Sequence, residues 1–260
     1  MSIQRLFGLE GKVAVVTGGS RGIGRMIAQG FVENGVRTYI TARNAEELGE
    51  TAEALSEFGE CLAVPADLSS VEGLKAFCAD IAQRESKLHI LVNNAGAVWG
   101  APIDEFPESG FDKVINLNLK APFFMIKSML PLLRAAGAID DPARIVNISS
   151  INGMTHSGNP NYSYSASKAG LIHLTRQLAA DLACDHVLVN GIAPGLFRTK
   201  TTEFALRTEV EREKQTAQIP LGRLGCYEDA AGTAIYLCSR ASAFVSGHTV
   251  VLDGGVVAAS

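Results

Sequence analysis

The fold is decided by the stretch KVAVVTGGSRGIG at residues 12–24. Its first half is an almost unbroken apolar run, which is typical of a strand buried on both faces. Glycines follow at positions 18, 19, 22 and 24, and a helical pattern begins near Arg25. Such a turn lets phosphate approach the backbone, and the helix N-terminus behind it offers unpaired N–H groups. Glycine-rich turns also occur without a ligand, but this one directly follows the first strand, which favours a dinucleotide site.

Around this unit, short apolar runs alternate with longer helical patterns along the whole chain. The alternation predicts an α/β fold of the Rossmann type, a doubly wound parallel sheet of seven strands with helices on both faces. We find no repeat, linker or low-complexity tract, so residues 1–260 are expected to form a single domain. Residues 198–225 are more charged and lack strand periodicity, and we expect a helical lid there. The predicted strands are 12–17, 36–41, 61–65, 88–93, 144–149, 186–192 and 249–252.

Composition excludes several classes of protein. The chain has 260 residues, 47% of them hydrophobic, and a formal net charge of −4. This balance gives no basic footprint for nucleic acid or an anionic membrane. No apolar run approaches the ~18 residues of a membrane span, and the N-terminus has no long apolar segment of the signal-peptide kind. The cytoplasm is the expected compartment.

Cysteines and histidines give no sign of a metal site. The five cysteines are scattered and never form a Cys-x-x-Cys pair, which favours free thiols over disulfides or zinc. The five histidines show no metal-ligand spacing either. We therefore expect no bound metal.

Tyr164 and Lys168 form a Tyr-x-x-x-Lys pair, with Ser150 upstream. Residues four apart share one helix face, so the phenol and the ammonium are expected to lie together. A neighbouring cation lowers the pKa of a phenol, whose reference value is about 10. A nearby serine hydroxyl polarises a carbonyl while the tyrosine protonates it. The pair alone also arises by chance on helix surfaces, and its weight depends on the other motifs.

The end of the second predicted strand distinguishes one nicotinamide cofactor from the other. An NAD site usually has an acid about 20 residues beyond the glycines, whereas here the chain reads Thr41-Ala42-Arg43 with no acid before Glu46. Arg43, together with Arg21 in the turn, is suited to clamp a 2′-phosphate. A strand-end arginine can also be a plain solubilising charge, but two at these places favour NADP(H).

Together these residues resemble the short-chain dehydrogenase/reductase family over essentially the whole chain. Within it the chain is similar to the NADPH-dependent 3-oxoacyl reductases of the rhamnolipid-biosynthesis type. The matching motifs come in the family's order: Thr17-Gly18-x-x-x-Gly22-Ile23-Gly24, Asp67, Asn93-Asn94-Ala95-Gly96, Asn118, Ser150, Tyr164, Lys168 and Pro194-Gly195-x-x-x-Thr199.

The resemblance implies a role for each matching position. Tyr164 is the acid in reduction, Ser150 stabilises the alkoxide, and Lys168 holds the nicotinamide ribose and lowers the tyrosine pKa. Asn118 helps to position a water that connects Lys168 to solvent. The catalytic set is Asn118, Ser150, Tyr164 and Lys168. The residues implied in cofactor binding are Gly18, Ser20, Arg21, Gly22, Ile23, Gly24, Arg43, Asp67, Leu68, Asn94, Ala95, Gly96, Tyr164, Lys168, Pro194, Gly195 and Thr199.

Some assignments stay open at this stage. Ser149 is adjacent to Ser150, and either hydroxyl can serve merely to end the strand. Tyr162 is interpreted as a packing or substrate-wall residue, because Ala166, not lysine, follows it at the fourth position. Four further side chains lie after predicted strands and are equally suited to line a pocket or to fill the core: Trp99, Met154, His156 and Phe197.

The substrate is less defined than the chemistry. The resemblance implies reduction of a 3-oxoacyl thioester by NADPH and assembly as a homotetramer, with a small carbonyl compound or alcohol as substrate. Reductases of that branch that bind acyl-carrier protein are expected to have basic residues late in the helix after Lys168, whereas this helix ends in Asp181 and Asp185. Coenzyme A esters and free ketones therefore remain possible substrates. Two alternatives are a dehydrogenase of sugar, polyol or steroid alcohols, and a non-catalytic dinucleotide sensor.

Overall fold

The computed structural model describes residues 2–156, 158–199, 202–203 and 206–259. Seven parallel strands form one sheet in the order β3-β2-β1-β4-β5-β6-β7. The predicted doubly wound α/β fold is therefore confirmed. The strands are β1 (Val13–Thr17), β2 (Arg37–Thr41), β3 (Cys61–Ala63), β4 (Ile90–Asn93), β5 (Ala143–Ile148), β6 (Val187–Pro194) and β7 (Thr249–Leu252).

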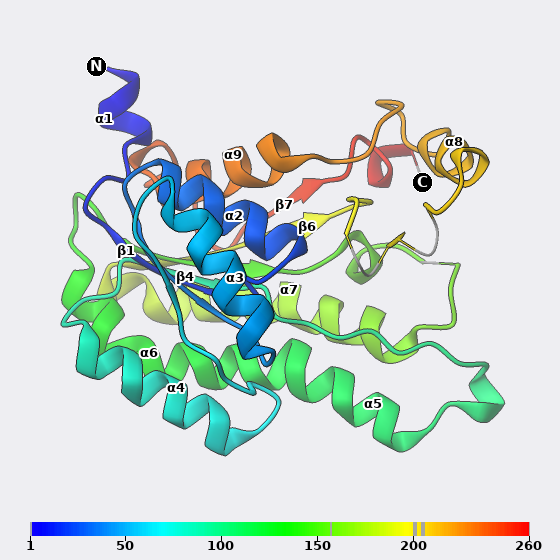
Figure 1. Ribbon diagram of the computed structural model, residues 1–260, viewed down its shortest axis with the longest axis horizontal. Coiled ribbons are helices and arrows are strands. Elements are labelled where there is room, and N and C mark those ends of the chain that lie inside the picture. The colour runs from blue at the N-terminus through cyan, green and yellow to red at the C-terminus, as the bar shows by residue number, and fades with distance from the viewer. Residues whose placement is uncertain (1, 157, 200–201, 204–205, 260) are drawn as a thin grey trace.

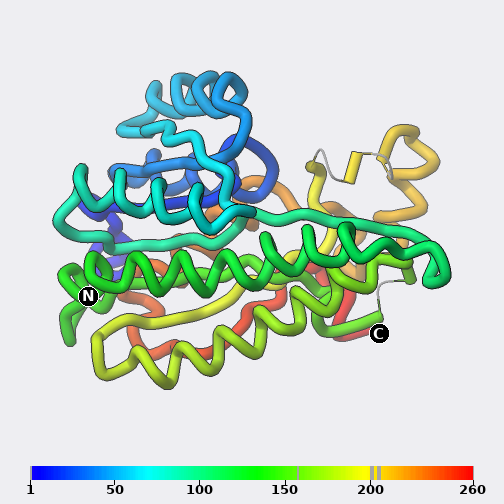
Figure 2. Tube along the Cα trace, turned by 90° about the horizontal axis from the view of Figure 1, so that it is seen from below, coloured from blue at the N-terminus to red at the C-terminus, as the bar shows by residue number. Residues whose placement is uncertain are grey.

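Helices cover both faces of this sheet (Figures 1 and 2). One apolar cluster joins the sheet to α2, α3 and α9, and a second joins the other face to α4, α6 and α7. Fully buried strands such as β1 and β5 follow from this two-sided cover. The helices are α1 (Ile3–Phe7), α2 (Gly22–Glu33), α3 (Ala45–Ser56), α4 (Val71–Arg84), α5 (Glu108–Ile115), α6 (Ala121–Ala136), α7 (Tyr162–Leu182), α8 (Glu209–Thr216) and α9 (Tyr227–Cys238).

The segment predicted to form a lid, residues 198–225, lies outside the sheet and carries α8. This helix begins with a capping box formed by Thr208 and Glu211. Phe197 and Gly225 form an isolated parallel bridge that joins the two ends of this segment. The Phe197 side chain is only 2% exposed and belongs to the core. Residues 200, 201, 204 and 205 of the predicted lid lie outside the described residues.

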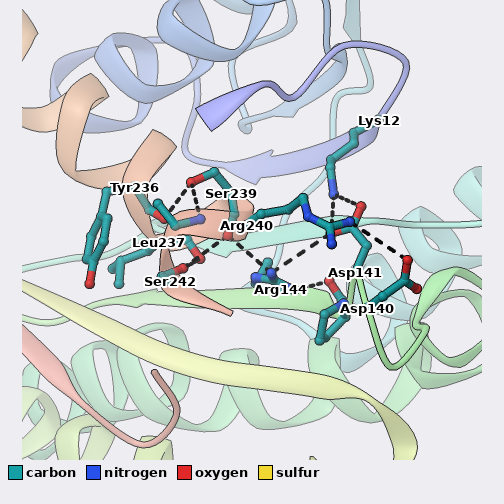
Figure 3. Close-up of polar contacts among 11 residues, drawn as sticks. Lys12, Asp140, Asp141, Arg144, Tyr236, Leu237, Ser239, Arg240 and Ser242 are labelled. Atoms are coloured by element: carbon teal, nitrogen blue, oxygen red, sulfur yellow. Dashed lines mark hydrogen bonds and ion pairs between the residues drawn. The ribbon is translucent and has the colours of Figure 1, made fainter. Parts of the chain in front are cut away.

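Charged side chains tie the amino ends of the strands together (Figure 3). Lys12 forms an ion pair with Asp141 at 2.7 Å, just before β1 and β5. The Arg144 guanidinium is buried and donates to the carbonyls of Pro142 and Ser239, the latter at 3.1 Å. A buried guanidinium needs such acceptors because its desolvation is costly. This network fixes the strand ends that lie away from the glycine turn.

The opposite, carboxyl edge of the sheet carries the candidate site. The strand order reverses between β1 and β4, and crevices at such a switch point are where ligands bind in open α/β sheets. None of the described helices is long and apolar enough to cross a membrane.

Candidate active site

The glycine turn after β1 has a backbone that only glycine suits at several points. Gly18 and Gly22 have φ values of 65° and 56°, in the left-handed region. A Cβ on Gly24 would lie 2.3 Å from both the Asn94 Nδ2 atom and the Gly18 carbonyl oxygen. Close packing of α2 on the strand ends therefore requires glycine at position 24.

Helix α2 begins at Gly22, and its N-cap residue Arg21 makes no side-chain capping bond. The first-turn N–H groups are thus left for an anion, with the positive end of the helix dipole behind them. Thr51 Oγ1 donates to the Ser20 carbonyl at 2.9 Å and ties the turn to α3. These features fit the pyrophosphate of a dinucleotide.

Arg43 and Arg21, the two arginines expected to clamp a 2′-phosphate, lie after β2 and in the glycine turn. Arg43 is exposed beyond the end of β2, and its charge reaches Asp67 after β3. Hydrogen bonds from Ser69 hold the pKa of Asp67 below its usual range, with a smaller effect from Arg43. Arg21 forms an exposed ion pair with Glu47 at 3.3 Å. No sequence motif indicated this partner, because Glu47 belongs to α3 and only the fold brings it to the turn.

The residues after β4 are fastened to the glycine turn. The Asn94 side chain donates to the carbonyls of Thr17 and Gly18 at 2.8 and 3.1 Å. Thr17 Oγ1 accepts from the backbone N–H groups of Asn94 and Ala95, both at 2.9 Å. Leu68, expected near the adenine, has its side chain in the core at 6% exposure, so any cofactor contact there falls to its backbone.

Tyr164 lies on the first turns of α7, with the Ser150 side chain near enough to act on its hydroxyl. Burial raises the pKa of Tyr164, while the Ser150 side chain opposes that rise. The Lys168 ammonium lies 5.6 Å from the centre of the Tyr164 ring and donates to the Ile148 carbonyl at 2.7 Å. Burial lowers the pKa of Lys168 to about 8. Burial is thus the larger effect on the pKa of Tyr164, and the expected lowering of that pKa by Lys168 stays a prediction.

The structure distinguishes the two adjacent serines by position. Ser149 Oγ donates to the Lys168 carbonyl at 2.9 Å and so serves the packing of α7 on β5. Ser150 accepts from the Asn152 N–H at 3.2 Å and lies at the Tyr164 hydroxyl. Side chains that alternate at a strand end explain this division. The second serine is the one that faces the site.

Asn118 lies in a π-helical turn (Asn116–Lys120) between α5 and α6. Its side chain accepts from the Ala97 N–H at 2.8 Å and donates to the Ala97 carbonyl at 2.9 Å. It also donates to Ser167 Oγ at 3.1 Å. These bonds join the loop after β4 to α7, a task that the motif had not indicated. Its expected part in holding a water stays a prediction.

The segment after β6 closes over the glycine turn. Gly195 N–H donates to the Leu252 carbonyl at 2.9 Å, continuing the pairing of β6 with β7 beyond Pro194. Thr199 lies near the turn, since a Cβ on Gly22 would meet its Cγ2 atom at 3.3 Å. Thr202, which the sequence did not single out, binds both the Thr199 N–H and the Phe197 carbonyl.

The structure distinguishes core from exposed positions among the side chains that were equally suited to line a pocket or to fill the core. Phe197 is core, and Trp99 packs on Gly110 of α5, with Lys113 stacked 5.4 Å from its ring centre. Met154 and Tyr162 are 38% and 44% exposed, so neither belongs to the core. Tyr162 packs edge-on against Phe106, with ring centres 5.6 Å apart. His156 Nδ1 accepts from the Gly158 N–H at 3.3 Å and is a loop-forming residue. Within the described part of the chain, no three metal-ligating side chains cluster.

Comparison with known proteins agrees with this geometry. A family profile described as enoyl-(acyl carrier protein) reductase matches residues 18–257. The rhamnolipids biosynthesis 3-oxoacyl-[acyl-carrier-protein] reductase of Pseudomonas aeruginosa is 45% identical, over 96% of this chain and 97% of its own. The 2-dehydro-3-deoxy-D-gluconate 5-dehydrogenase of Dickeya dadantii is 37% identical, over 98% of this chain and 99% of its own.

A solved structure gives the same result. The Pseudomonas aeruginosa RhlG/NADP active-site complex superposes with a TM-score of 0.95 at 44% identity, covering 97% of this chain and 99% of the other. The expected resemblance is confirmed. The chain belongs to the short-chain dehydrogenase/reductase family of oxidoreductases.

Proposed function

We propose that this chain is an NADPH-dependent reductase that converts the ketone of a 3-oxoacyl thioester to the secondary alcohol. The observation that carries the proposal is the grouping of Tyr164, Ser150 and Lys168 at the sheet edge that holds the glycine turn: Ser150 acts on the Tyr164 hydroxyl, and the Lys168 ammonium lies 5.6 Å from the Tyr164 ring centre. Residues 1–260 act as one dinucleotide-binding domain, and residues 198–225 act as its lid. The named relative from Pseudomonas aeruginosa supports the substrate class.

The proposed chemistry divides among the chain's own residues. Bound NADPH supplies the hydride. Ser150 donates a hydrogen bond to the carbonyl oxygen, which favours the negative charge that develops on it. Tyr164 then gives its proton to that oxygen. Because burial raises the pKa of Tyr164, the phenol is fully protonated near neutral pH, as reduction requires.

Lys168 binds the cofactor in this proposal. With a pKa of about 8, its side chain is mostly a cation at pH 7, and it binds the ribose hydroxyls of the cofactor. Asn118 and Ser167 hold the start of α7, so that the lysine and the tyrosine keep their places. Asn118 is also the proposed anchor of the water that returns a proton to the site.

NADPH is the proposed cofactor because Arg43 and Arg21 flank the expected 2′-phosphate site. Asp67 and Leu68 approach the adenine, and Asn94 to Gly96 line the adenosine ribose. The backbone of Pro194 and Gly195, with Thr199, holds the nicotinamide carboxamide. The solved relative with bound NADP supports this choice.

An acyl substrate is supported by apolar side chains at the carboxyl edge of the sheet. Among the large hydrophobic side chains exposed in the segments that follow β4, β5 and β6 are Val98, Ile103, Met154, Tyr162, Val210 and Leu221. An aliphatic tail would cover such surface, whereas a sugar acid calls for polar groups. The helix after Lys168 ends in Asp181 and Asp185, and the basic side chain of Arg134 is already paired with Asp185 at 2.8 Å. This pairing favours a coenzyme A ester over a carrier protein.

The test is a panel of ketones with NADPH and NADH, followed through nicotinamide absorbance. We expect acetoacetyl-coenzyme A with NADPH to exceed acetoacetyl-carrier protein and sugar ketones in kcat/KM. Tyr164→Phe should lower kcat by about 10²–10⁴-fold and leave NADPH binding intact, while Tyr162→Phe should be active. Unchanged turnover in Tyr164→Phe contradicts the mechanism. A faster oxidation of sugar or polyol alcohols would favour the dehydrogenase, and NADPH binding without any turnover would favour a sensor.

We also propose a homotetramer acting in the cytoplasm. An apolar groove between α6 and α7, lined by Leu119, Phe123, Phe124 and Leu174, supports contact with a second copy. All five cysteines carry free thiols, as is usual in a reducing compartment. Sedimentation equilibrium tests the assembly, and Phe123→Asp should shift it toward smaller species.

A further inference from the structure

Three consecutive residues at the carboxyl end of β5 each bond to helix α7. Asn147 Nδ2 donates to Thr175 Oγ1 at 2.9 Å. The Ile148 carbonyl accepts from the Lys168 ammonium at 2.7 Å, and Ser149 Oγ donates to the Lys168 carbonyl at 2.9 Å. Thr175 follows Lys168 by seven residues, about two helical turns, so both face β5. The helix is thus bonded to the strand at two points along its axis.

The contact at Thr175 is one end of a buried polar chain that leads to the glycine turn. Asn93 Nδ2 donates to Asn147 Oδ1 at 2.9 Å, across paired positions of β4 and β5. The next residue, Asn94, donates to the Gly18 carbonyl at 3.1 Å. Asn93, Asn147 and Thr175 are 4%, 0% and 1% exposed. The glycine turn and the catalytic helix are therefore joined by directional bonds, of which those from Asn93 to Thr175 are buried.

The bond to β5 is not needed by the helix itself. Thr175 Oγ1 donates to the Leu171 carbonyl at 2.8 Å, within α7, and this orients its lone pairs toward Asn147. Beyond the bonds at Ser149 and Lys168, α7 meets this face of the sheet through apolar side chains such as Leu178 and Leu182. Apolar packing is non-directional and specifies the axial position of a helix less sharply than a hydrogen bond does. The hydroxyl fixes the register of α7 on β5.

From this geometry we propose that Thr175, acting through Asn147, is a positioning residue for Lys168. It holds α7 at the axial position where the Lys168 ammonium donates to the Ile148 carbonyl and Tyr164 lies close to Ser150. Thr175 lies two turns from Lys168 and contacts neither substrate nor cofactor. The role in catalysis rests on the proposed function, whereas the positioning of the lysine can be measured without turnover.

The direct test is an NMR titration of Lys168 in protein carrying ¹³Cε-labelled lysine, assigned with Lys168→Arg. Thr175→Val keeps the shape of the side chain and removes the hydroxyl. Displacement of the ammonium from its carbonyl leaves a buried cation with fewer acceptors. We therefore expect the lysine to titrate at least one pH unit lower than in the wild type. Thr38→Val is the matched control, because Thr38 is 0% exposed and donates to the Val36 carbonyl, far from α7.

Kinetics provide the second measurement. Thr175→Val should lower kcat about tenfold, as expected for a displaced catalytic group, and leave the KM for NADPH within twofold. Thr175→Ser keeps the hydroxyl and should restore both the titration and kcat. If Thr175→Val does not fold, Thr175→Cys, with its weaker acceptor, should show the same shift in smaller measure.

The outcomes separate the two proposals. A wild-type titration of Lys168 in Thr175→Val or Thr175→Cys overturns the positioning role, as does an equal shift in Thr38→Val. If the wild-type protein reduces no ketone, the proposed function fails, and the lysine titration still decides the role of Thr175.

Discussion

Substituting Gly24 by alanine tests the packing of the glycine turn most sharply. The added Cβ would lie 2.3 Å from Asn94 Nδ2 and from the Gly18 carbonyl oxygen. Relief requires Asn94 to give up its bonds to Thr17 and Gly18, at about 0.5–1.5 kcal/mol each. Overpacking adds about 1–3 kcal/mol. We therefore expect a loss of about 2–6 kcal/mol of unfolding free energy, or roughly 4–24 °C in Tm for a chain of this size.

Gly49→Ala is the matched control, since it makes the same change in helix α3. No atom lies within 4 Å of the added Cβ there, so only the helix propensity changes, and stability should rise by about 0.5–1 kcal/mol. Thermal unfolding is followed with and without NADPH. The wild type and Gly49→Ala should gain Tm with the cofactor, and Gly24→Ala should not. The reasoning fails if Gly24→Ala unfolds at the wild-type temperature and keeps the NADPH-induced gain.

Three more predictions concern single side chains. His89 Nδ1 accepts from the Val13 N–H at 3.0 Å, and burial lowers the pKa of His89. Its neutral form thus contributes stability that is present above pH ~6.5 and is lost below it. When the pH falls from 7.5 to 5.5, the free energy of urea unfolding should therefore decline less in His89→Gln than in the wild type. Arg43→Ala should raise the KM for NADPH at least tenfold and spare that for NADH, in steady-state assays. Ser150→Ala should lower kcat by about 10²–10³-fold and leave the NADPH affinity, measured by fluorescence, unchanged. An equal loss of kcat in Ser149→Ala would contradict the assignment of the two serines.

Local sequence patterns were sufficient for the fold. All seven predicted strands lie within two residues of the observed ones at each end, because runs such as residues 13–16 are apolar on both sides and glycines mark their ends. The 3-residue β3 is the shortest and ends before the predicted Pro65, since it pairs with β2 alone at the sheet edge. Helix α8 outside the sheet agrees with the charged, non-alternating excursion that was predicted.

Contacts between distant segments could not be read in this way. The bond of Lys168 to the Ile148 carbonyl joins residues 20 apart through backbone geometry, and no residue type signals a carbonyl acceptor. The sign of the Tyr164 pKa shift depends on burial, which the five-residue motif does not contain. Pairing of Arg21 with Glu47 likewise depends on how α3 lies beside the turn. Motifs thus identify the reacting groups, while their electrostatics come from the packing.

The bridge between Phe197 and Gly225 has a consequence for how such an enzyme diversifies. Since both ends of the intervening segment are pinned at one place, its length can change at little entropic cost, about 0.6 kcal/mol for each doubling of a loop. Insertions beyond Thr199 and Thr202 leave the strands and the proposed cofactor contacts undisturbed. Residues 206–224 thereby form an exchangeable segment, and grafting the corresponding segment of a relative offers a route to a new substrate preference on an unchanged hydride-transfer scaffold.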